Sequence, residues 1–280
     1  MKLSKFILGY GIASTLAISG LFLSNPVQAQ AQSNRAFIVF VNGSGDCCAD
    51  EMREARARLE KGVNGGIWIT SYANFANGSS TRRVPVVNLS VNDDNLFINE
   101  AARIINVIPA NRPVVLIGHS YGGDSILKVL PFITRRVQLV AVIDPVGTGG
   151  FRKVATRRVV PNNVDYFLNR WQENGLTGDN VVPLDSRVSG QIRCLATKGC
   201  DQDSANLARN ADGSEIRENC RWDEVTCPGF VAPNPFIGRK GRKGTKAVRI
   251  EHNPMPQDAY IQHTVVEKIK VALRPVGVLE

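Results

Sequence analysis

The sequence predicts an α/β protein with a mostly parallel central sheet flanked by helices. Continuous apolar segments of strand length alternate with segments whose apolar residues have helical spacing. Such alternation is typical of parallel strands joined by right-handed crossovers. The 280 residues are 43% hydrophobic and 21% charged, which is globular composition and excludes wholly disordered, collagen-like and low-complexity classes.

The N-terminal residues 1–31 have the features of a secretory signal peptide. A basic start precedes the apolar residues 6–23, and small residues precede candidate cleavage points after Ala29 and Ala31. An uncleaved membrane anchor is the alternative, although the apolar segment barely reaches the length of a spanning helix. We therefore expect an exported protein, secreted or periplasmic, with a single domain over residues 32–280.

The elements of that domain follow from the local patterns. In chain order we expect a strand 36–41, a helix 50–61, a strand 65–70, a short strand 84–89, a helix capped by Asp93 or Asp94, a strand 113–117, a helix 125–132, and strands 137–143 and 164–171. From about 175 to 245 the pattern fails. We interpret this stretch as a disulfide-stapled, lid-like insertion, followed by a last strand 247–250 and a helix 258–273.

Six cysteines indicate disulfides, because the number is even and the chain is expected to be exported. Loop closure favours the near neighbours, Cys194 with Cys200 and Cys220 with Cys227. A bridge between adjacent cysteines is strained, so Cys47 and Cys48 are expected to reach distant partners. Zinc is disfavoured, since the spacings are not C-x-x-C and no histidine lies beside them.

The segment Gly118-His-Ser-Tyr-Gly122 fits the G-x-S-x-G pattern. It directly follows a buried strand and precedes a helix, which is the context in which this motif places a serine on a sharp turn at the carboxyl end of a sheet. A Gly-rich turn or a phosphate-binding loop is the alternative, but no G-x-G-x-x-G or G-K-[ST] accompanies it. Ser120 is therefore the candidate nucleophile.

A serine nucleophile needs a base, and the chain has three histidines. The side chain of His119 is expected to point away from the neighbouring Ser120. His263 lies two residues after Ile261, about 200° around the last helix, and so faces away from its apolar stripe. His252, just past the last predicted strand, is the expected base.

The base needs a carboxylate that fixes its orientation. Asp144 is the expected acid, because it closes a buried strand one strand after the elbow. Asp179 and Asp185 are alternatives. The expected oxyanion donors are the backbone N–H groups of Tyr121 and of the loop with Gly43 and Ser44. A plain strand-ending turn is the alternative interpretation of that loop.

These residues resemble the α/β-hydrolase superfamily, with lipases and esterases as the nearest likeness. The resemblance rests on the order Ser120, Asp144, His252 and on the elbow Gly118 to Asp124, and covers about 36–145 and 246–273. It departs from the family where many members have His-Gly in the oxyanion loop, since this chain has Asn42-Gly43. The resemblance implies a serine hydrolase that cleaves a carboxylic ester of a small molecule or lipid through an acyl-enzyme, with no metal or organic cofactor. A thioesterase or acyltransferase with the same triad, or a non-catalytic binding protein on this fold, are the alternatives.

Two features of the predicted insertion bear on partners. Its apolar residues Phe230, Phe236 and Ile237 are candidates for contact with an acyl group, or else pack the insertion onto the core. A basic run is either a solvated loop or attracts an anionic surface such as phospholipid or acidic polysaccharide; its residues are Arg239, Lys240, Arg242, Lys243 and Lys246. Nucleic acid is not expected, because no aromatic residues interleave with the basic ones.

Overall fold

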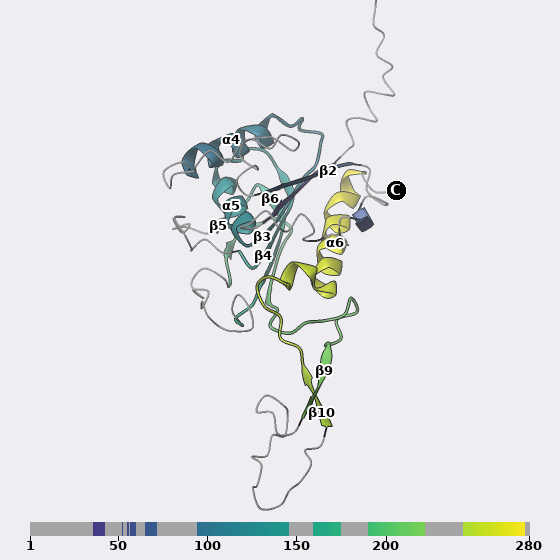
Figure 1. Cartoon of the computed structure of the whole chain (residues 1–280). Helices are drawn as coiled ribbons and strands as arrows, with labels where there is room; N and C mark the ends of the chain where they lie inside the picture. The colour runs from purple at the N-terminus through teal and green to yellow at the C-terminus, as the bar shows by residue number, and fades with distance from the viewer. Residues whose placement is uncertain are drawn as a thin grey trace, which may run out of the picture.

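The computed structural model describes residues 36–42, 52, 55, 57–59, 65–71, 94–145, 159–174, 190–221 and 243–277. A six-stranded parallel sheet forms the centre of the described part, in the order β2-β1-β3-β4-β6-β8 (Figure 1). Its strands are β1 (Ala36–Asn42), β2 (Gly65–Ser71), β3 (Val114–His119), β4 (Val137–Ile143), β6 (Val164–Trp171) and β8 (Gly199–Ser204).

Helices cover both faces of this sheet. On one face lie α4 (Asp94–Val107) and α5 (Tyr121–Val129), the latter continued by the short helix η1 (Leu130–Phe132), and on the other lies α6 (Ala259–Leu273) (Figure 1). Successive strand residues point to opposite faces, so Val39 packs with the α4 and α5 layer whereas Ile38 packs with α6. The described strands β3 and β4 are buried along their whole length, which accounts for their continuous apolar sequence.

Most predicted elements are confirmed within the described residues. Strands 137–143 and 164–171 have the predicted bounds, and the last helix begins after Asp258, whose carboxylate accepts hydrogen bonds from the backbone N–H groups of Tyr260 and Ile261. The helix after the elbow begins at Tyr121, four residues earlier than expected. Residues 55 and 57–59 are helical, and the short strand 84–89 lies outside the described residues.

The predicted insertion contributes to the sheet, contrary to expectation. Within it, β8 pairs with β6 and forms an edge strand of the sheet. Its residues are exposed or only partly buried, so its sequence Gly-Cys-Asp-Gln-Asp-Ser shows no apolar pattern. The expected last strand 247–250 does not join the sheet. Instead β10 (Lys243–Ala247) pairs antiparallel with β9 (Arg217–Arg221), and Arg249 forms an isolated bridge with Leu207.

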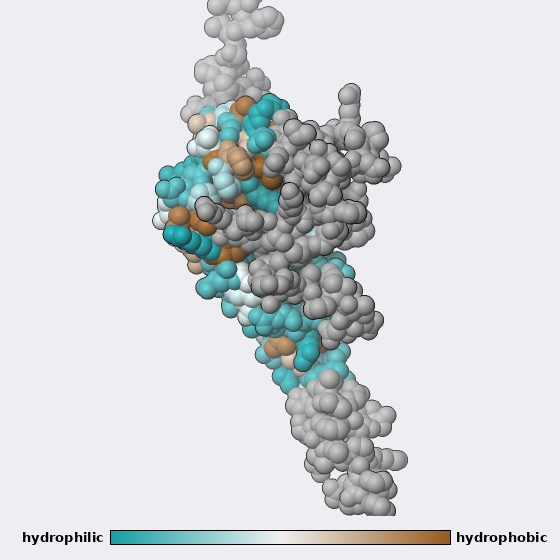
Figure 2. All heavy atoms as spheres, turned by 90° about the vertical axis from the view of Figure 1, so that its left-hand side faces the viewer, coloured by the Kyte–Doolittle hydropathy of each residue, from teal (hydrophilic) through white to brown (hydrophobic). Residues whose placement is uncertain are grey.

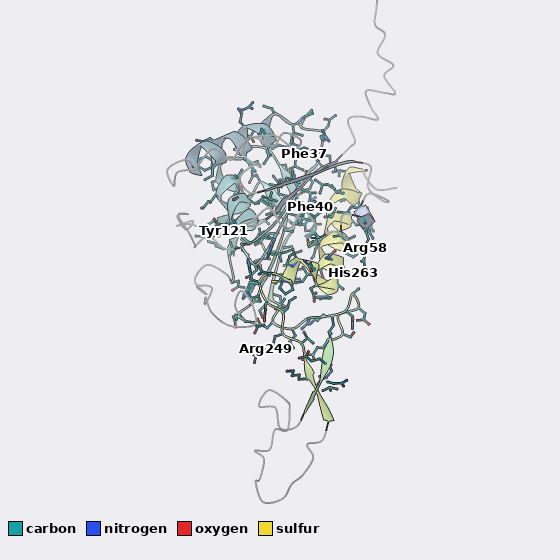
Figure 3. The ribbon with its side chains drawn as sticks, in the orientation of Figure 1. Phe37, Phe40, Arg58, Tyr121, Arg249 and His263 are labelled. Atoms are coloured by element: carbon teal, nitrogen blue, oxygen red, sulfur yellow. A yellow bond between two sulfur atoms is a disulfide. The ribbon has the colours of Figure 1, made fainter. Side chains whose placement is uncertain are left out.

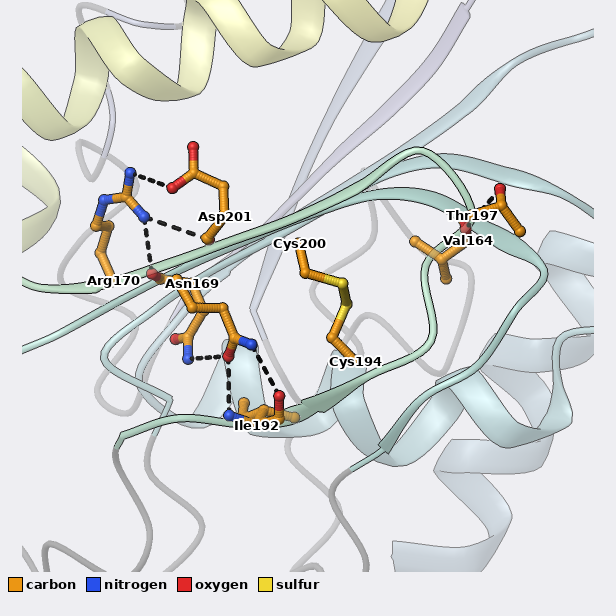
Figure 4. Close-up of a disulfide and its surroundings, with 9 residues drawn as sticks. Val164, Asn169, Arg170, Ile192, Cys194, Thr197, Cys200 and Asp201 are labelled. Carbon is orange, nitrogen blue, oxygen red and sulfur yellow. Dashed lines mark hydrogen bonds and ion pairs between the residues drawn. A yellow bond between two sulfur atoms is a disulfide. The ribbon is translucent and has the colours of Figure 1, made fainter.

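The predicted pairing of Cys194 with Cys200 is confirmed (Figure 4). Cys194 belongs to the two-residue strand β7 (Arg193–Cys194), which pairs with β5 (Val159–Val160), and Cys200 belongs to β8. The bridge thus joins the small second sheet to the edge of the central one. Beside it, the side chain of Gln202 bonds the backbone N–H and C=O of Ile192, at 2.8 and 2.9 Å, which fastens the same two segments.

Several predictions concern residues outside the described ranges. They are the signal peptide 1–31, Cys47, Cys48, Cys227, the alternative acids Asp179 and Asp185, and much of the stretch 175–245. The side chain of Cys220 is also outside them, so its pairing stays a prediction. No helix among the residues that the structure describes has the length and apolar character needed to cross a bilayer.

Candidate active site

The serine of the G-x-S-x-G motif lies on a strained turn between β3 and α5. Ser120 has φ 55° and ψ −128°, a backbone conformation that residues other than glycine rarely adopt. Its backbone N–H donates to the C=O of Ile143 at 3.1 Å, and its C=O accepts from the N–H of Asp124 at 3.1 Å. These bonds fix the turn between the neighbouring strand and the first turn of the helix, so the strain is held in place from both sides.

Two glycines of the elbow, Gly118 and Gly123, lie close to neighbouring backbone atoms. A Cβ on Gly118 would lie 2.7 Å from backbone atoms of both Gly122 and Gly123, closer than real Cβ atoms come. A Cβ on Gly123 would lie 3.1 Å from the carbonyl oxygen of Gly118 and from the Cβ of Pro145. The strand and helix can therefore meet at this angle only with glycine at 118, whereas a side chain at 123 would require its neighbours to shift slightly.

The three residues of the expected triad meet at the carboxyl edge of the sheet. The Oγ of Ser120 lies 2.8 Å from Nε2 of His252, and Nδ1 of the same ring lies 2.8 Å from Oδ2 of Asp144. With a neutral ring, the hydroxyl donates to Nε2 and the Nδ1–H donates to the carboxylate. All three side chains are buried, with exposed fractions of 6% for the serine, 3% for the histidine and 0% for the aspartate. This is the geometry of a hydroxyl, a base and a carboxylate that orients the base.

Asp144 is held at the end of β4 by its own backbone and by a glutamine. Its φ of 40° is strained, and its N–H donates to the C=O of Arg170 at 2.7 Å, which extends the pairing of β4 with β6 by one residue. The side-chain amide of Gln172 donates to Oδ2 at 2.7 Å, and Gln172 is only 1% exposed. Oδ2 therefore accepts two hydrogen bonds, one from the glutamine and one from the imidazole.

An asparagine ties the same strand end to the loop that carries the histidine. The Nδ2 group of Asn174 donates to the backbone oxygens of Asn206 and Ile250, each at 2.7 Å, and its N–H donates to Oε1 of Gln172 at 2.6 Å. Beyond His252, Met255 is fully buried against α6 and donates its N–H to the C=O of Glu251. The loop is thereby fixed on both sides of the imidazole.

His119, the residue before the serine, also contacts the imidazole of His252. Its ring lies 4.6 Å from the ring of His252, centre to centre, and its Nε2–H donates to the backbone C=O of that residue at 3.0 Å. The prediction that His119 is not the base is consistent with this placement. The sequence does not predict the contact between His119 and His252. Alternation along a strand indicates only that the side chains of His119 and Ser120 point to opposite faces.

The other candidate residues fall into two groups. His263 lies on α6 and is partly exposed (Figure 3). Tyr121 opens α5, so the positive end of the helix dipole lies beside the serine hydroxyl. The remaining candidates, Gly43 and Ser44 of the oxyanion loop and Phe230, Phe236 and Ile237 of the acyl pocket, lie outside the described residues.

Gln172 and Asn174 are the site residues that the sequence reasoning missed. Both follow directly after the predicted strand 164–171, so they leave the sheet at the same edge as Asp144. Their position after a predicted strand could have indicated this, because the carboxyl ends of parallel strands meet at one edge of the sheet. No cluster of three or more His, Cys, Asp or Glu side chains suited to a metal ion occurs in the described part of the chain.

The parallel sheet, the strained elbow after β3, the acid after β4 and the late histidine together form the α/β-hydrolase fold, as the sequence predicts. Ser120 follows β3 and Asp144 follows β4, as expected. His252 follows the antiparallel pair β9 and β10 and not a strand of the central sheet.

Comparison with known proteins gives structural matches of low similarity. No family model matches the chain, and no curated protein matches it in sequence. A cutinase-like protein from Cryptococcus sp. superposes with a TM-score of 0.43 at 14% identity, covering 85% of this chain and 95% of that one. MGS-M1, an alpha/beta hydrolase enzyme from a Medee basin deep-sea metagenome library, has a TM-score of 0.33 at 13% identity over 62% of this chain and 73% of its own. SOBER1 from Arabidopsis thaliana has a TM-score of 0.31 at 17% identity over 61% and 88%. Because the TM-scores and the sequence identities are low, no substrate or role transfers from these proteins to this chain.

Proposed function

We propose that this chain is an exported serine hydrolase that cleaves a carboxylic ester through an acyl-enzyme. The observation that carries the proposal is the hydrogen-bonded series Ser120, His252, Asp144, with 2.8 Å at each step. A hydroxyl bonded to an imidazole that is itself bonded to a buried carboxylate has the roles required for acyl transfer. Export is supported by the Cys194–Cys200 disulfide and by the N-terminal sequence.

In the proposed reaction, Oγ of Ser120 attacks the ester carbonyl while Nε2 of His252 takes the hydroxyl proton. Asp144 holds the ring with Nδ1–H toward the carboxylate and stabilises the positive charge that forms on the ring. Collapse of the tetrahedral intermediate breaks the ester C–O bond, and the imidazolium gives its proton to the leaving alcohol. Water then attacks the acyl-enzyme with His252 as base, which releases the acid and restores the serine.

The developing oxyanion needs donors near the serine. The backbone N–H of Tyr121 is the first candidate, because it follows the nucleophile at the start of α5. Gly43 and Ser44 stay the candidates for the second donor. In support, β1 pairs with β3 up to the level of Val41 opposite Gly118, so the chain leaves β1 next to the elbow.

A fluorophosphonate probe tests the proposal directly, since it labels only an activated serine. We expect labelling of the wild-type protein and none of Ser120→Ala. His252→Ala should lower the rate of ester hydrolysis by roughly 10⁶-fold, whereas His263→Ala, the matched control, should leave it near the wild-type value. Labelling that persists in Ser120→Ala, or a folded wild-type protein that stays unlabelled both with and without detergent, would refute the nucleophile and favour a binding protein. Acyl transfer would be recognised by an ester product when an alcohol competes with water.

A further inference from the structure

The loop that carries His252 does not follow a strand of the central sheet. The residues before it belong to β10, which pairs with β9, and an isolated bridge joins Arg249 to Leu207. A base must stay within about 3 Å of the hydroxyl that it deprotonates, whereas loops are ordinarily more mobile than the elements that they connect. Side chains at the strand ends of the sheet must therefore hold this loop in place.

His119 lies at such a strand end and faces the loop. It is the last residue of β3 and only 4% exposed. The alternate residues before it, Val115 and Ile117, belong to the core on the α6 side of the sheet, and so does Met255 of the loop. His119 therefore points to that side. The surface over α4 and α5, which Figure 2 shows as a mixture of hydrophilic and hydrophobic residues, lies on the other side of the sheet.

Two contacts join the imidazole of His119 to His252. A carbonyl oxygen can only accept a hydrogen bond, so the bond of 3.0 Å between Nε2 of His119 and the backbone C=O of His252 requires the proton on Nε2. The two rings lie 4.6 Å apart, centre to centre, with their planes inclined by 32°. Aromatic pairs at such separations attract one another. The hydrogen bond fixes the backbone of the base, and the ring contact restricts how far its imidazole can tilt.

Two consecutive residues of the chain therefore hold different parts of the same base. Ser120 contacts Nε2 of His252 at 2.8 Å, and His119 contacts its backbone and its ring. Asn174 bonds the same loop at Ile250, whereas His119 bonds the base itself. We propose that His119 is a positioning residue that sets the place of the base relative to the nucleophile. This role rests on the proposed hydrolase function, since it matters only where His252 acts as a base.

Three substitutions separate the two contacts. His119→Gln keeps an N–H donor of similar reach and removes the ring, His119→Phe keeps a ring and removes the donor, and His119→Leu removes both. The measurements are the second-order rate constant of fluorophosphonate labelling and the kinetics of a soluble ester. We expect the labelling rate and kcat to fall roughly 3- to 10-fold in the first two variants and roughly 10- to 100-fold in the third, with KM within about twofold of wild type.

Val115→Ala is the matched control, because Val115 is fully buried earlier in the same strand and on the same face. This change removes buried methyl groups, so it should lower the unfolding temperature but leave kcat within about twofold of wild type. Wild-type rates in His119→Leu, equal losses of kcat in His119→Leu and Val115→Ala, or a loss that appears only in KM would each overturn the proposal. Thermal unfolding checks that every variant is folded.

The wild-type protein provides a check that needs no variant. Nitrogen NMR distinguishes protonated from unprotonated positions of an imidazole, and the chain has just three histidines. We expect Nε2 of His119 to be protonated; an unprotonated Nε2 could not donate to the C=O of His252 and would overturn the proposal. The fluorophosphonate result separates the two levels of inference. Unlabelled wild-type protein would refute the hydrolase and the positioning role together, whereas labelled wild-type protein with unchanged rates in His119→Leu would refute the positioning role alone.

Discussion

The side-chain amide of Gln172 donates a hydrogen bond of 2.7 Å to Oδ2 of Asp144, the same oxygen that accepts from the imidazole. Both residues leave the sheet at adjacent strand ends, and both are almost completely buried. The glutamine thus limits how the carboxylate can turn, and through it the orientation of the base. Because it bonds the carboxylate that orients the imidazole, we expect Gln172 to be a positioning residue.

Replacing this glutamine should therefore impair the chemistry more than binding. In Gln172→Leu we expect kcat to fall about 10- to 100-fold with little change in KM, because hydrogen bonds to charged groups are worth about 1.5–3 kcal/mol. Steady-state kinetics on a soluble ester measure this. Gln138→Leu is the control, since Gln138 is also buried and accepts from the N–H of Val114 at the opposite end of the sheet. An equal loss of kcat in both variants would reduce Gln172 to a structural role.

The elbow should tolerate no side chain at its first glycine. Gly118→Ala brings a Cβ to 2.7 Å from the backbone of Gly122 and Gly123, so the serine must shift. We expect kcat/KM to fall roughly 10²-fold, as displacements of about 1 Å in a catalytic group do. Gly123→Ala meets its neighbours only at 3.1 Å and should be milder. The reverse order of severity in kinetic assays would show that the elbow is formed differently.

Removal of the Cys194–Cys200 disulfide should lower stability without lowering kcat. The bridge closes a loop between residues separated by six positions, and chain entropy assigns such a loop about 2 kcal/mol. Urea unfolding of the double variant to serine, compared with the oxidised wild type, measures the difference. Thr197→Ser, within the same loop, provides the control. Coincident unfolding midpoints for the double variant and the wild type would contradict the expectation.

The ion pairs of Asp201 should make stability depend on acid pH. Partial burial raises the pKa of this carboxyl, but hydrogen bonds from Lys268 and Arg170 outweigh it and hold the pKa below the ordinary 3.8. A carboxyl with a depressed pKa stabilises the folded state above its unfolded value, and that contribution is lost as pH falls through the folded value. Asp201→Asn should therefore be less stable than wild type at neutral pH, by at most about 1 kcal/mol because the pair is partly exposed.

The pH dependence of that difference provides the check. It should shrink once the pH falls below about 4 and vanish in stronger acid, and it should also shrink at high salt. Thermal unfolding of the two proteins across this range measures it. A difference that stays constant from neutral pH into strong acid would mean that Asp201 acts through packing instead of charge.

Prediction from sequence succeeded where burial on both faces leaves a continuous apolar segment. Strands 137–143 and 164–171 were located to the residue. The side chains of Ser120, His252 and Asp144, chosen from the motif and by comparing the three histidines, lie within hydrogen-bonding distance of one another; their catalytic roles stay a prediction. Prediction failed at β8, because an edge strand needs no apolar pattern to pair. Gln172 was missed for a different reason: a glutamine after a strand has no chemical signature until its distance to Asp144 is known.

The composition of β8 has a further consequence for how copies of this protein meet. A sheet edge presents unpaired backbone groups to which a strand of another molecule can add, and long apolar edges aggregate in this way. Here the edge strand β8 is short and carries two aspartates among its six residues, and the nearby disulfide restrains the chain that leads into it. Asp201 is ion-paired with Arg170 and Lys268, so another molecule that approached this edge would have to bring its own strand against the carboxylate of Asp203 and against polar side chains. The polar sequence that prevented prediction of β8 as a strand therefore also disfavours the addition of a strand from another molecule at this edge.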